Sequence, residues 1–331
     1  MLEAVQVIGT AAEAEYAALR TGAVAIDRSQ RARWRFTGPK APETMTGLVT
    51  NDVVALANGQ GQYAALLTPK GKIIADVTIY RVATGLVLDV PPRAAAGFAE
   101  TIRKYVNPKV VAYEDETAAT CDVGAYGVRS AAIVAQAVGL APEALAALPP
   151  HGHLSAADGL VVRVPTLGLD GFAVIAPASE RDTIWQRLLA AGAVAGSAAV
   201  WDVARVEAGR PEWGVDIDET TIPQEAGFDE LGAISYTKGC YTGQETVARI
   251  HFRGHVNRHL RGLRMNDDVQ PPATTLVDHT GKPVGDIRST VRSPRLGAIA
   301  LAMLRREVEI GATILAGETP VTVTSLPFPA T

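Results

Sequence analysis

Residues 238–245 of the chain read KGCYTGQE and set one cysteine, Cys240, in a glycine-flanked loop just ahead of a predicted helix. Thr242 and Glu245 have the T-x-x-E spacing of a capping box, in which the hydroxyl and the carboxylate satisfy free backbone N–H groups. This spacing predicts a helix that begins at Gly243. The unpaired amides at a helix start carry a partial positive charge, which favours a thiolate at Cys240.

Two interpretations of Cys240 remain open on the sequence alone. One is a small buried side chain in a tight turn, because free cysteines are often buried. The other is a reactive or ligand-facing thiol, which the two glycines, the capping signal and the nearby cation of Lys238 favour. We therefore nominate Cys240 and Lys238 as candidate catalytic residues.

The composition indicates a globular protein with more than one domain. The chain has 331 residues, 47% hydrophobic and 20% charged, with a formal net charge of −4. Single cores seldom grow past about 250 residues, so two or three domains are expected. The charge gives no global nucleic-acid signature, so direct nucleic-acid binding is not expected. The two cysteines cannot form a disulfide scaffold or supply the four thiolates of a usual iron–sulfur site.

The N-terminal residues and the lengths of the apolar runs indicate where in the cell the protein is expected. The N-terminus carries Glu3, Glu13 and Glu15 and lacks the basic region and apolar run of a secretory signal. No uncharged run approaches the ~18 apolar residues that span a bilayer. We expect a cytoplasmic protein without a membrane partner.

The order of periodic segments predicts an α+β fold. Residues 10–20 read as a helix, and residues 59–82 (GQGQYAALLTPKGKIIADVTIYRV) read as a hairpin that turns at Lys70–Gly71. Residues 31–38 (RARWRFTG) alternate basic and bulky side chains, as a half-buried strand does. Beyond Asn257, short strands predict a small all-β domain. Its expected turns are at Asp267–Asp268, Gly281–Lys282 and Ser293–Pro294.

Several connecting segments carry weaker signals. Ser179 is expected to cap a helix that carries Ile184, Trp185, Leu188 and Leu189 on one face, with Gly192 just past its end. A second helix is expected over residues 199–207. The acidic stretch that follows, GRPEWGVDIDETTIPQEAGFDE, has little periodicity and is expected to be an ordered loop that covers another part of the molecule.

Asp76 lies in the middle of the predicted strand IIADVTIY. A buried carboxylate without a partner costs several kcal/mol, so Asp76 must either face solvent or meet a partner. Strict alternation puts Asp76 on one face with Ile74 and Thr78, and puts Ile73 and its alternate neighbours on the other. A solvent-facing carboxylate and a pocket carboxylate are both compatible with this pattern.

Histidines and arginines outside these elements suggest two further sites. His151 and His153 lie in a Pro- and Gly-containing stretch, residues 142–155, which we expect to be a surface connection. Two loop histidines without a third ligand do not predict a metal site. Residues 246–264 hold five arginines, three histidines and no acid. Arg249 and Arg253 share one helical face in this segment, which suits an anionic ligand tail, although a solvated basic face is the commoner explanation.

The chain resembles the YgfZ family of folate-binding proteins, relatives of the glycine-cleavage T-protein (aminomethyltransferase). The resemblance rests on KGCYTGQETVAR, on the preceding RVEAGRPEWGVDIDETTIPQEAGF, and on GKPVGDIRSTVRSPRLGAIALAML near the C-terminus. The stretches AIDRSQRARWRFTGPKAPETMTGLVTNDV and GQGQYAALLTPKGKIIADVTIYR fall in the expected order, so it spans nearly the whole chain. The cysteine in the KGCYTGQE motif is specific, because T-proteins resemble this motif but carry no cysteine there.

This resemblance implies a three-domain ring around a tetrahydrofolate pocket. Residues 1–255 would form the folate-binding region of two intertwined, ferredoxin-like α/β lobes, and residues 256–331 a small β-barrel. The implied role is the assembly or repair of iron–sulfur enzymes and, through them, tRNA modification. The partners would be folate and iron–sulfur client or assembly proteins.

The resemblance also assigns candidate residues. In T-proteins the second Asp of a G-x-x-x-D-D segment lies near the folate reaction centre, and Asp76 occupies that position here. The candidate catalytic residues are Cys240, Asp76 and Lys238. The candidate folate ligands are Asn51, Asp76, Arg205, Glu207, Tyr241 and Arg249.

Two positions depart from the T-protein pattern. The Glu that follows a G-[YF] pair and holds the pterin in T-proteins is Ala173 here, so Glu207 is an alternative pterin ligand. The first Asp of the D-D pair is Ala75. Three hypotheses follow: a folate-dependent accessory factor for iron–sulfur enzymes, a one-carbon transferase or demethylase, and a non-catalytic module that binds RNA or protein. The departures favour the first.

Overall fold

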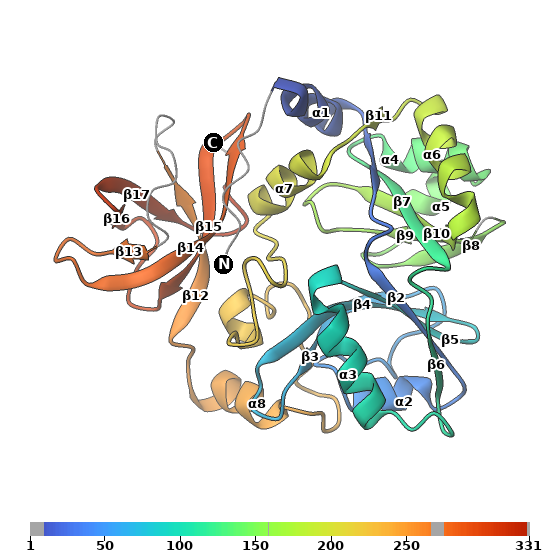
Figure 1. The fold of residues 1–331 in the computed structure, drawn as a ribbon, viewed down its shortest axis with the longest axis horizontal. Helices are drawn as coiled ribbons and strands as arrows, with labels where there is room; N and C mark the ends of the chain where they lie inside the picture. Colours follow the sequence, from blue (N-terminus) through green and yellow to red (C-terminus); the bar gives the residue numbers. More distant parts are fainter. Residues whose placement is uncertain (1–9, 158, 266–274, 330–331) are drawn as a thin grey trace.

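Two sheet-and-helix lobes and a closed β-barrel surround a central segment of the chain (Figure 1). The computed structural model describes residues 10–157, 159–265 and 275–329. This arrangement confirms the predicted α+β fold with a C-terminal β-barrel. No helix among the described residues is long and apolar enough to cross a membrane.

The first lobe is built on a six-stranded sheet with the order β11-β1-β7-β10-β9-β8. Its helices pack apolar faces on the sheet, and α6 buries Ile184 and Leu188 as predicted. Its strands are β1 (Val24–Asp27), β7 (Thr120–Tyr126), β8 (His153–Ala156), β9 (Gly159–Arg163), β10 (Gly171–Pro177) and β11 (Val194–Ala195). Its helices are α1 (Thr10–Thr21), α4 (Ser130–Val138), α5 (Pro142–Ala146), α6 (Arg181–Ala190) and α7 (Ala198–Glu207), with a 3₁₀ turn, η2 (Ala178–Glu180).

The second lobe is built on a five-stranded antiparallel sheet with the order β3-β4-β5-β2-β6. The predicted hairpin is confirmed: Gly71 N donates to Thr68 O at 2.9 Å and closes the turn between β3 and β4. Helix α3 buries Phe98 and Ile102 against the sheet. The strands are β2 (Ala32–Thr37), β3 (Gly61–Leu67), β4 (Ile73–Val82), β5 (Gly85–Val90) and β6 (Ala112–Asp115); the helices are α2 (Ala41–Thr46), η1 (Pro92–Ala94) and α3 (Ala95–Tyr105).

The chain threads through both lobes. After β1 it leaves the six-stranded sheet, builds the whole five-stranded sheet, and returns with β7. At this crossing Arg33 is fully buried, and its guanidinium lies 3.9 Å from the carboxylates of both Asp89 and Asp122. The half-buried reading of residues 31–38 is therefore wrong at Arg33, because carboxylates from both sheets flank this cation.

The third part is a closed six-stranded barrel with the order β12-β15-β14-β13-β16-β17. Helix α8 (Gln244–Arg253) precedes it. The predicted turns at Gly281–Lys282 and Ser293–Pro294 are confirmed, and Asp267–Asp268 lies outside the described residues. The strands are β12 (Arg258–Arg264), β13 (Thr275–Val277), β14 (Pro283–Ser293), β15 (Gly297–Arg305), β16 (Thr313–Ala316) and β17 (Thr319–Thr324).

Two local predictions in the first lobe are wrong. Ser179 lies inside η2 and makes no cap, because α6 begins at Arg181 directly from this 3₁₀ turn. Residues 142–155 are more than a surface connection. They contain α5 and most of β8, whose His153 is buried and pairs its Nε2 with Arg81 O at 2.9 Å.

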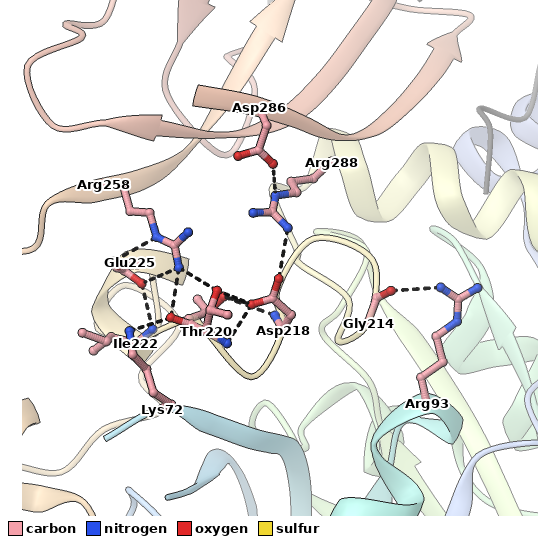
Figure 2. A network of polar contacts seen from close by, with 11 residues as sticks. Lys72, Arg93, Gly214, Asp218, Thr220, Ile222, Glu225, Arg258, Asp286 and Arg288 are labelled. Atoms are coloured by element: carbon pink, nitrogen blue, oxygen red, sulfur yellow. Dashed lines mark hydrogen bonds and ion pairs between the residues drawn. The ribbon is translucent and has the colours of Figure 1, made fainter. Parts of the chain in front are cut away.

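The central segment, residues 209–228, runs between the lobes and the barrel and ends in a 3₁₀ turn, η3 (Pro223–Ala226). Four cationic side chains hold it from opposite sides (Figure 2). Two come from the second lobe and two from the barrel: Lys72 Nζ to Thr220 O (2.5 Å), Arg93 Nη1 to Gly214 O (3.1 Å), Arg258 Nε to Glu225 (3.0 Å) and Arg288 Nη1 to Asp218 (3.2 Å). The prediction of an ordered covering loop is confirmed.

Candidate active site around Asp76

A cavity of about 310 Å³ opens where the two lobes and the central segment meet. This volume lies at the lower end of the range for small-molecule pockets. Its lining is mostly polar and brings together cations, carboxylates and aromatic rings. The lining residues used below are Arg28, Arg31, Tyr63, Asp76, Thr78, Asp89, His151, Trp201, Asp202, Arg205, Arg210 and Glu212.

Asp76 projects into this cavity from the centre of β4. It is buried on the same strand face as Thr78, which also lines the cavity, so the solvent-facing interpretation is wrong. Tyr63 on the neighbouring strand donates its hydroxyl to Asp76 Oδ2 at 2.9 Å. Burial raises the pKa of Asp76 to about 6, against the attraction of Arg31. Asp76 Oδ1 is buried and has no hydrogen-bond partner among the described residues, which leaves one acceptor of this carboxyl group unsatisfied.

Arginines from both lobes line the cavity together with carboxylates. Arg31 Nε binds Asp89 at 2.7 Å, and the guanidinium of Arg28 lies 4.0 Å from the ring centre of Trp201. The Arg210 side chain comes from the central segment. Carboxylate or phosphate groups of a ligand would be attracted to Arg28 and Arg210, for which no ion pair is present among the described residues.

Arg205 lines the cavity, as expected for a folate-site residue, and also joins three parts of the fold. It is 4% exposed and binds Asp202 at 2.7 Å and Asp216 at 2.7 Å. Its Nη2 donates to Ser289 Oγ of β14 at 3.0 Å. These carboxylates raise the pKa of Arg205 above its ordinary value, so the side chain stays charged.

Glu207 points away from the cavity, towards the barrel. Its carboxylate accepts hydrogen bonds from Tyr16 at 2.9 Å and from Ser293, and pairs with Arg295 at 3.3 Å. Ala173 is buried in β10. Folate binding by Glu207 stays a prediction, and the contacts present in the structure give Glu207 a role in holding α7 to the barrel.

Lys238, Tyr241 and Asn51 form a second group beside the end of α2. Lys238 Nζ donates to Thr46 O and to Val49 O (2.8 Å) and lies 4.3 Å from the ring centre of Tyr241. Burial lowers the pKa of Lys238 to about 8. Asn51 Nδ2 donates to Tyr63 O at 3.0 Å and to Gly232 O at 2.9 Å. None of the three is among the cavity-lining residues, so their proposed chemical roles stay predictions.

The two glycines at the hairpin turn and the start of α8 lie against each other. Gly71 and Gly243 both have left-handed backbones, with φ of 77° and 82°. A Cβ on Gly243 would come 2.6 Å from Thr68 O, and one on Gly71 would come 2.7 Å from Thr246 Cβ. The capping-box prediction is wrong: α8 begins at Gln244, and Gly243 is its N-cap without a side-chain hydrogen bond. The backbone of this loop packs closely on the hairpin, which explains why residue 243 is a glycine.

Cys240 is exposed in the loop before α8, so the interpretation as a buried turn residue is wrong. Cys121 is buried in β7, where burial raises the pKa of its thiol. Cys240 is not among the residues that line the Asp76 cavity. Its participation in folate chemistry stays a prediction.

Thiol labelling should separate the two cysteines. In the native protein we expect Ellman's reagent to react rapidly with one thiol per chain, because Cys240 is exposed and Cys121 is not. The second thiol should react only after unfolding. Cys240→Ser should remove the rapid phase, and a persistent rapid phase in that variant would show that Cys121 is accessible.

Helix α8 carries exposed basic and aromatic side chains. Arg249 and Arg253 are exposed and make no ion pair with any residue in the described ranges. Phe252 is 66% exposed, and the His251 ring stacks on Tyr236 with centres 3.6 Å apart. Arg249 therefore faces solvent rather than the Asp76 cavity.

Tyr63, Arg31 and His151 are cavity residues that the sequence reasoning missed. The hairpin register contained a signal for Tyr63, because pairing Ala65 with Asp76 places Tyr63 on the same sheet face. His151 was expected on the surface; it lines the cavity instead. Within the described parts of the chain, no cluster of three or more His, Cys, Asp or Glu side chains could hold a metal ion.

Comparison with known families agrees with this architecture. The family model of the GCVT N-terminal domain matches residues 5–234, and that of the CAF17 C-terminal beta-barrel domain matches residues 258–328. The chain belongs to the GCVT N-terminal domain family. The predicted kinship with aminomethyltransferases is thus confirmed at the level of this family, which implies tetrahydrofolate use.

Individual members of the GCVT family match over most of the chain. An aminomethyltransferase of Rubrobacter xylanophilus is 30% identical, covering 96% of this chain and 85% of its own length. One from Synechococcus is 29% identical, covering 95% and 89%. The crystal structure of glycine cleavage system aminomethyltransferase T from Bartonella henselae superposes with a TM-score of 0.85 at 24% identity, covering 96% of this chain and 90% of that one. The last similarity shows the shared fold.

Proposed function

We propose that this protein binds tetrahydrofolate and acts as an accessory factor in the assembly or repair of iron–sulfur enzymes, through which it supports tRNA modification. The observation that carries the folate part is the buried Asp76 carboxyl group, which lines a cavity together with arginines and whose Oδ1 has no hydrogen-bond partner among the described residues. The family membership and the resemblance to YgfZ proteins support the rest.

The cavity residues fit the parts of tetrahydrofolate. Asp76 Oδ1 is an acceptor suited to an N–H group of the reduced pterin, and the Tyr63 hydroxyl holds the other carboxyl oxygen in place. Arg28, Arg31 and Arg210 suit the glutamate carboxylates. Bound tetrahydrofolate supplies nitrogens that carry one-carbon units. Asp76, with a pKa of about 6, is suited to holding or releasing a proton at Oδ1 near neutral pH.

Three features support an accessory role over aminomethyl transfer. Cys240 is exposed in the loop that precedes α8, where a protein partner has access to the thiol. Ala173 and Ala75 stand where T-proteins carry acids. The barrel matches a model named for CAF17. We propose that iron–sulfur client or assembly proteins approach the loop that carries Cys240.

Ligand titration together with complementation tests the proposal. The purified protein should bind tetrahydrofolate and folinic acid, and Cys240→Ala should bind them equally well because Cys240 lies outside the cavity. In a deletion strain, Cys240→Ala should fail to restore the activity of iron–sulfur enzymes. Absence of folate binding by the unaltered protein would refute the folate part, and full rescue by Cys240→Ala would remove the thiol from the function.

The second candidate is a folate-dependent one-carbon transferase or demethylase, favoured by relatives named aminomethyltransferase at about 30% identity. Incubation with an aminomethylated carrier protein or methylated glycines and tetrahydrofolate separates the two. Formation of methylene-tetrahydrofolate would favour the transferase. Its absence with intact folate binding is the result expected for the accessory factor.

A further inference from the structure

His151 reaches the cavity from the segment that links α5 to β8. Its ring plane lies within 13° of that of Tyr63, with the ring centres 6.5 Å apart. Tyr63 is the residue that donates to Asp76. The imidazole therefore extends the aromatic wall that begins beside the Asp76 carboxyl group.

The backbone at His151 is held in an unfavourable conformation. Its φ is 61°, and it is the one non-glycine residue with positive φ in the described ranges. Such a conformation is costly for a residue with a Cβ and persists where the surroundings enforce it. His151 is the third residue of a turn that Gly152 N closes by donating to Pro149 O at 2.8 Å, and both lobes hold this turn: His153 N donates to Gly59 O at 2.9 Å, and Arg163 N donates to Gly152 O at 2.8 Å.

Close packing adds to this constraint. A Cβ on Gly61 would come 2.4 Å from His151 O, so the linking segment lies directly on the first residue of β3. Non-glycine residues held at positive φ cluster at active sites and ligand-binding positions. The backbone conformation of His151 directs its imidazole towards the cavity.

The imidazole itself is neutral and free to bind a ligand. Burial, followed by the charge of Arg210, lowers the pKa of His151 to about 4. A neutral imidazole offers one hydrogen-bond donor and one acceptor. Neither ring nitrogen of His151 has a hydrogen-bond partner among the described residues, whereas His153 Nε2, two residues on, is paired with Arg81 O.

We propose that His151 is a positioning residue, which orients a planar heteroaromatic ring in the cavity by stacking beside Tyr63 and by hydrogen bonding to the polar edge of that ring. This inference rests on the proposed function, in which the ring is the pterin of tetrahydrofolate. A flat ring with hydrogen-bond donors and acceptors on its edge can both stack beside Tyr63 and hydrogen bond to the imidazole. A flexible aliphatic ligand does neither.

Binding of tetrahydrofolate to full-length variants tests the proposal by calorimetry. His151→Ala should weaken binding about 10-fold or more, because stacking and a hydrogen bond are both lost. His151→Phe keeps the aromatic face and should weaken it about 3-fold to 5-fold. The matched control is His255→Ala, an exposed histidine beyond α8, which should leave affinity unchanged.

Thermal unfolding of His151→Gly and His151→Ala without ligand tests the strain separately. Both lack the ring, but glycine accepts positive φ, so the glycine variant should unfold at a temperature about 1–3 °C higher than the alanine variant. At a position with negative φ, the alanine variant would unfold at the higher temperature. Both variants should bind tetrahydrofolate equally weakly.

The outcomes separate the two proposals. If the unaltered protein binds tetrahydrofolate and His151→Ala binds within twofold of it, the role of His151 is overturned and the proposed function stands. If the unaltered protein does not bind, the proposed function fails and the pterin assignment fails with it. An alanine variant more stable than the glycine variant would overturn the strain that holds the ring in place.

Discussion

Asp76→Asn is expected to lose measurable affinity for tetrahydrofolate while becoming more stable than the unaltered protein at pH 8. The amide has one acceptor oxygen in place of two, carries no charge and cannot take up a proton, so its interaction with a ligand N–H group is weaker. Removing a buried charged partner of this kind costs several kcal/mol of binding. Isothermal titration at pH 7.5 measures the loss.

The stability gain follows from the direction of the pKa shift. Asp76 has a pKa of about 6 in the folded protein and an ordinary value of 3.8, so the folded state holds the proton more tightly than the unfolded state. The protein therefore loses stability as the pH rises from about 4 to about 6, by as much as ~3 kcal/mol, and stays at the lower level above that window. The Asp76→Asn side chain carries no charge and avoids this loss.

Urea unfolding at pH 4.5 and pH 8 measures the effect. The difference in unfolding free energy between Asp76→Asn and the unaltered protein should be larger at pH 8 than at pH 4.5. The matched control is Glu245→Gln, an exposed carboxylate on α8, which should change neither stability nor binding. An Asp76→Asn variant that is less stable at pH 8 would show that the carboxylate is well solvated or paired when ionised.

Arg205→Ala is expected to reduce the free energy of unfolding by about 3–5 kcal/mol. The guanidinium is the cation beside Asp216, which is 0% exposed, and its loss leaves that carboxylate buried without a charge partner. The same change removes a link between α7 and Ser289 of the barrel. Equilibrium unfolding in urea measures the loss.

A double variant and a surface control sharpen this test. Arg205→Ala with Asp216→Ala should be more stable than Arg205→Ala alone, because the unpaired charge is gone. Arg249→Ala, on the exposed face of α8, should stay within about 0.5 kcal/mol of the unaltered protein. A loss below about 1 kcal/mol for Arg205→Ala would mean that water or another cation reaches Asp216.

The sequence correctly predicted the elements that depend on interactions between residues close together in the chain. The Lys70–Gly71 turn needs a left-handed residue, and the alternation of β4 correctly grouped Asp76 with Thr78. Helix periodicity placed the buried residues of α6. The turns of the barrel followed from Gly and Pro positions. These signals are contained within a few residues and do not depend on distant partners.

Features that depend on contacts between distant segments were missed. Thr242 and Glu245 have capping-box spacing, but the packing of Gly243 on Thr68 decides how α8 begins. Arg33 looked like a solvent-facing cation until carboxylates from two sheets were placed beside it. His151 lies in a stretch rich in turn residues, and its place in the cavity lining depends on both lobes meeting there. No periodic pattern encodes these contacts.

The path of the chain has a consequence for how the protein is made. The five-stranded sheet is continuous in sequence between residues 32 and 115, whereas β1 must wait for its partners β7 and β11, the second of which ends at Ala195. During synthesis from the N-terminus, the five-stranded sheet of the second lobe is therefore complete while β1, the first strand of the six-stranded sheet, is still unpaired. One edge of β1 stays unpaired until β11 has been made, when more than half of the residues have left the ribosome.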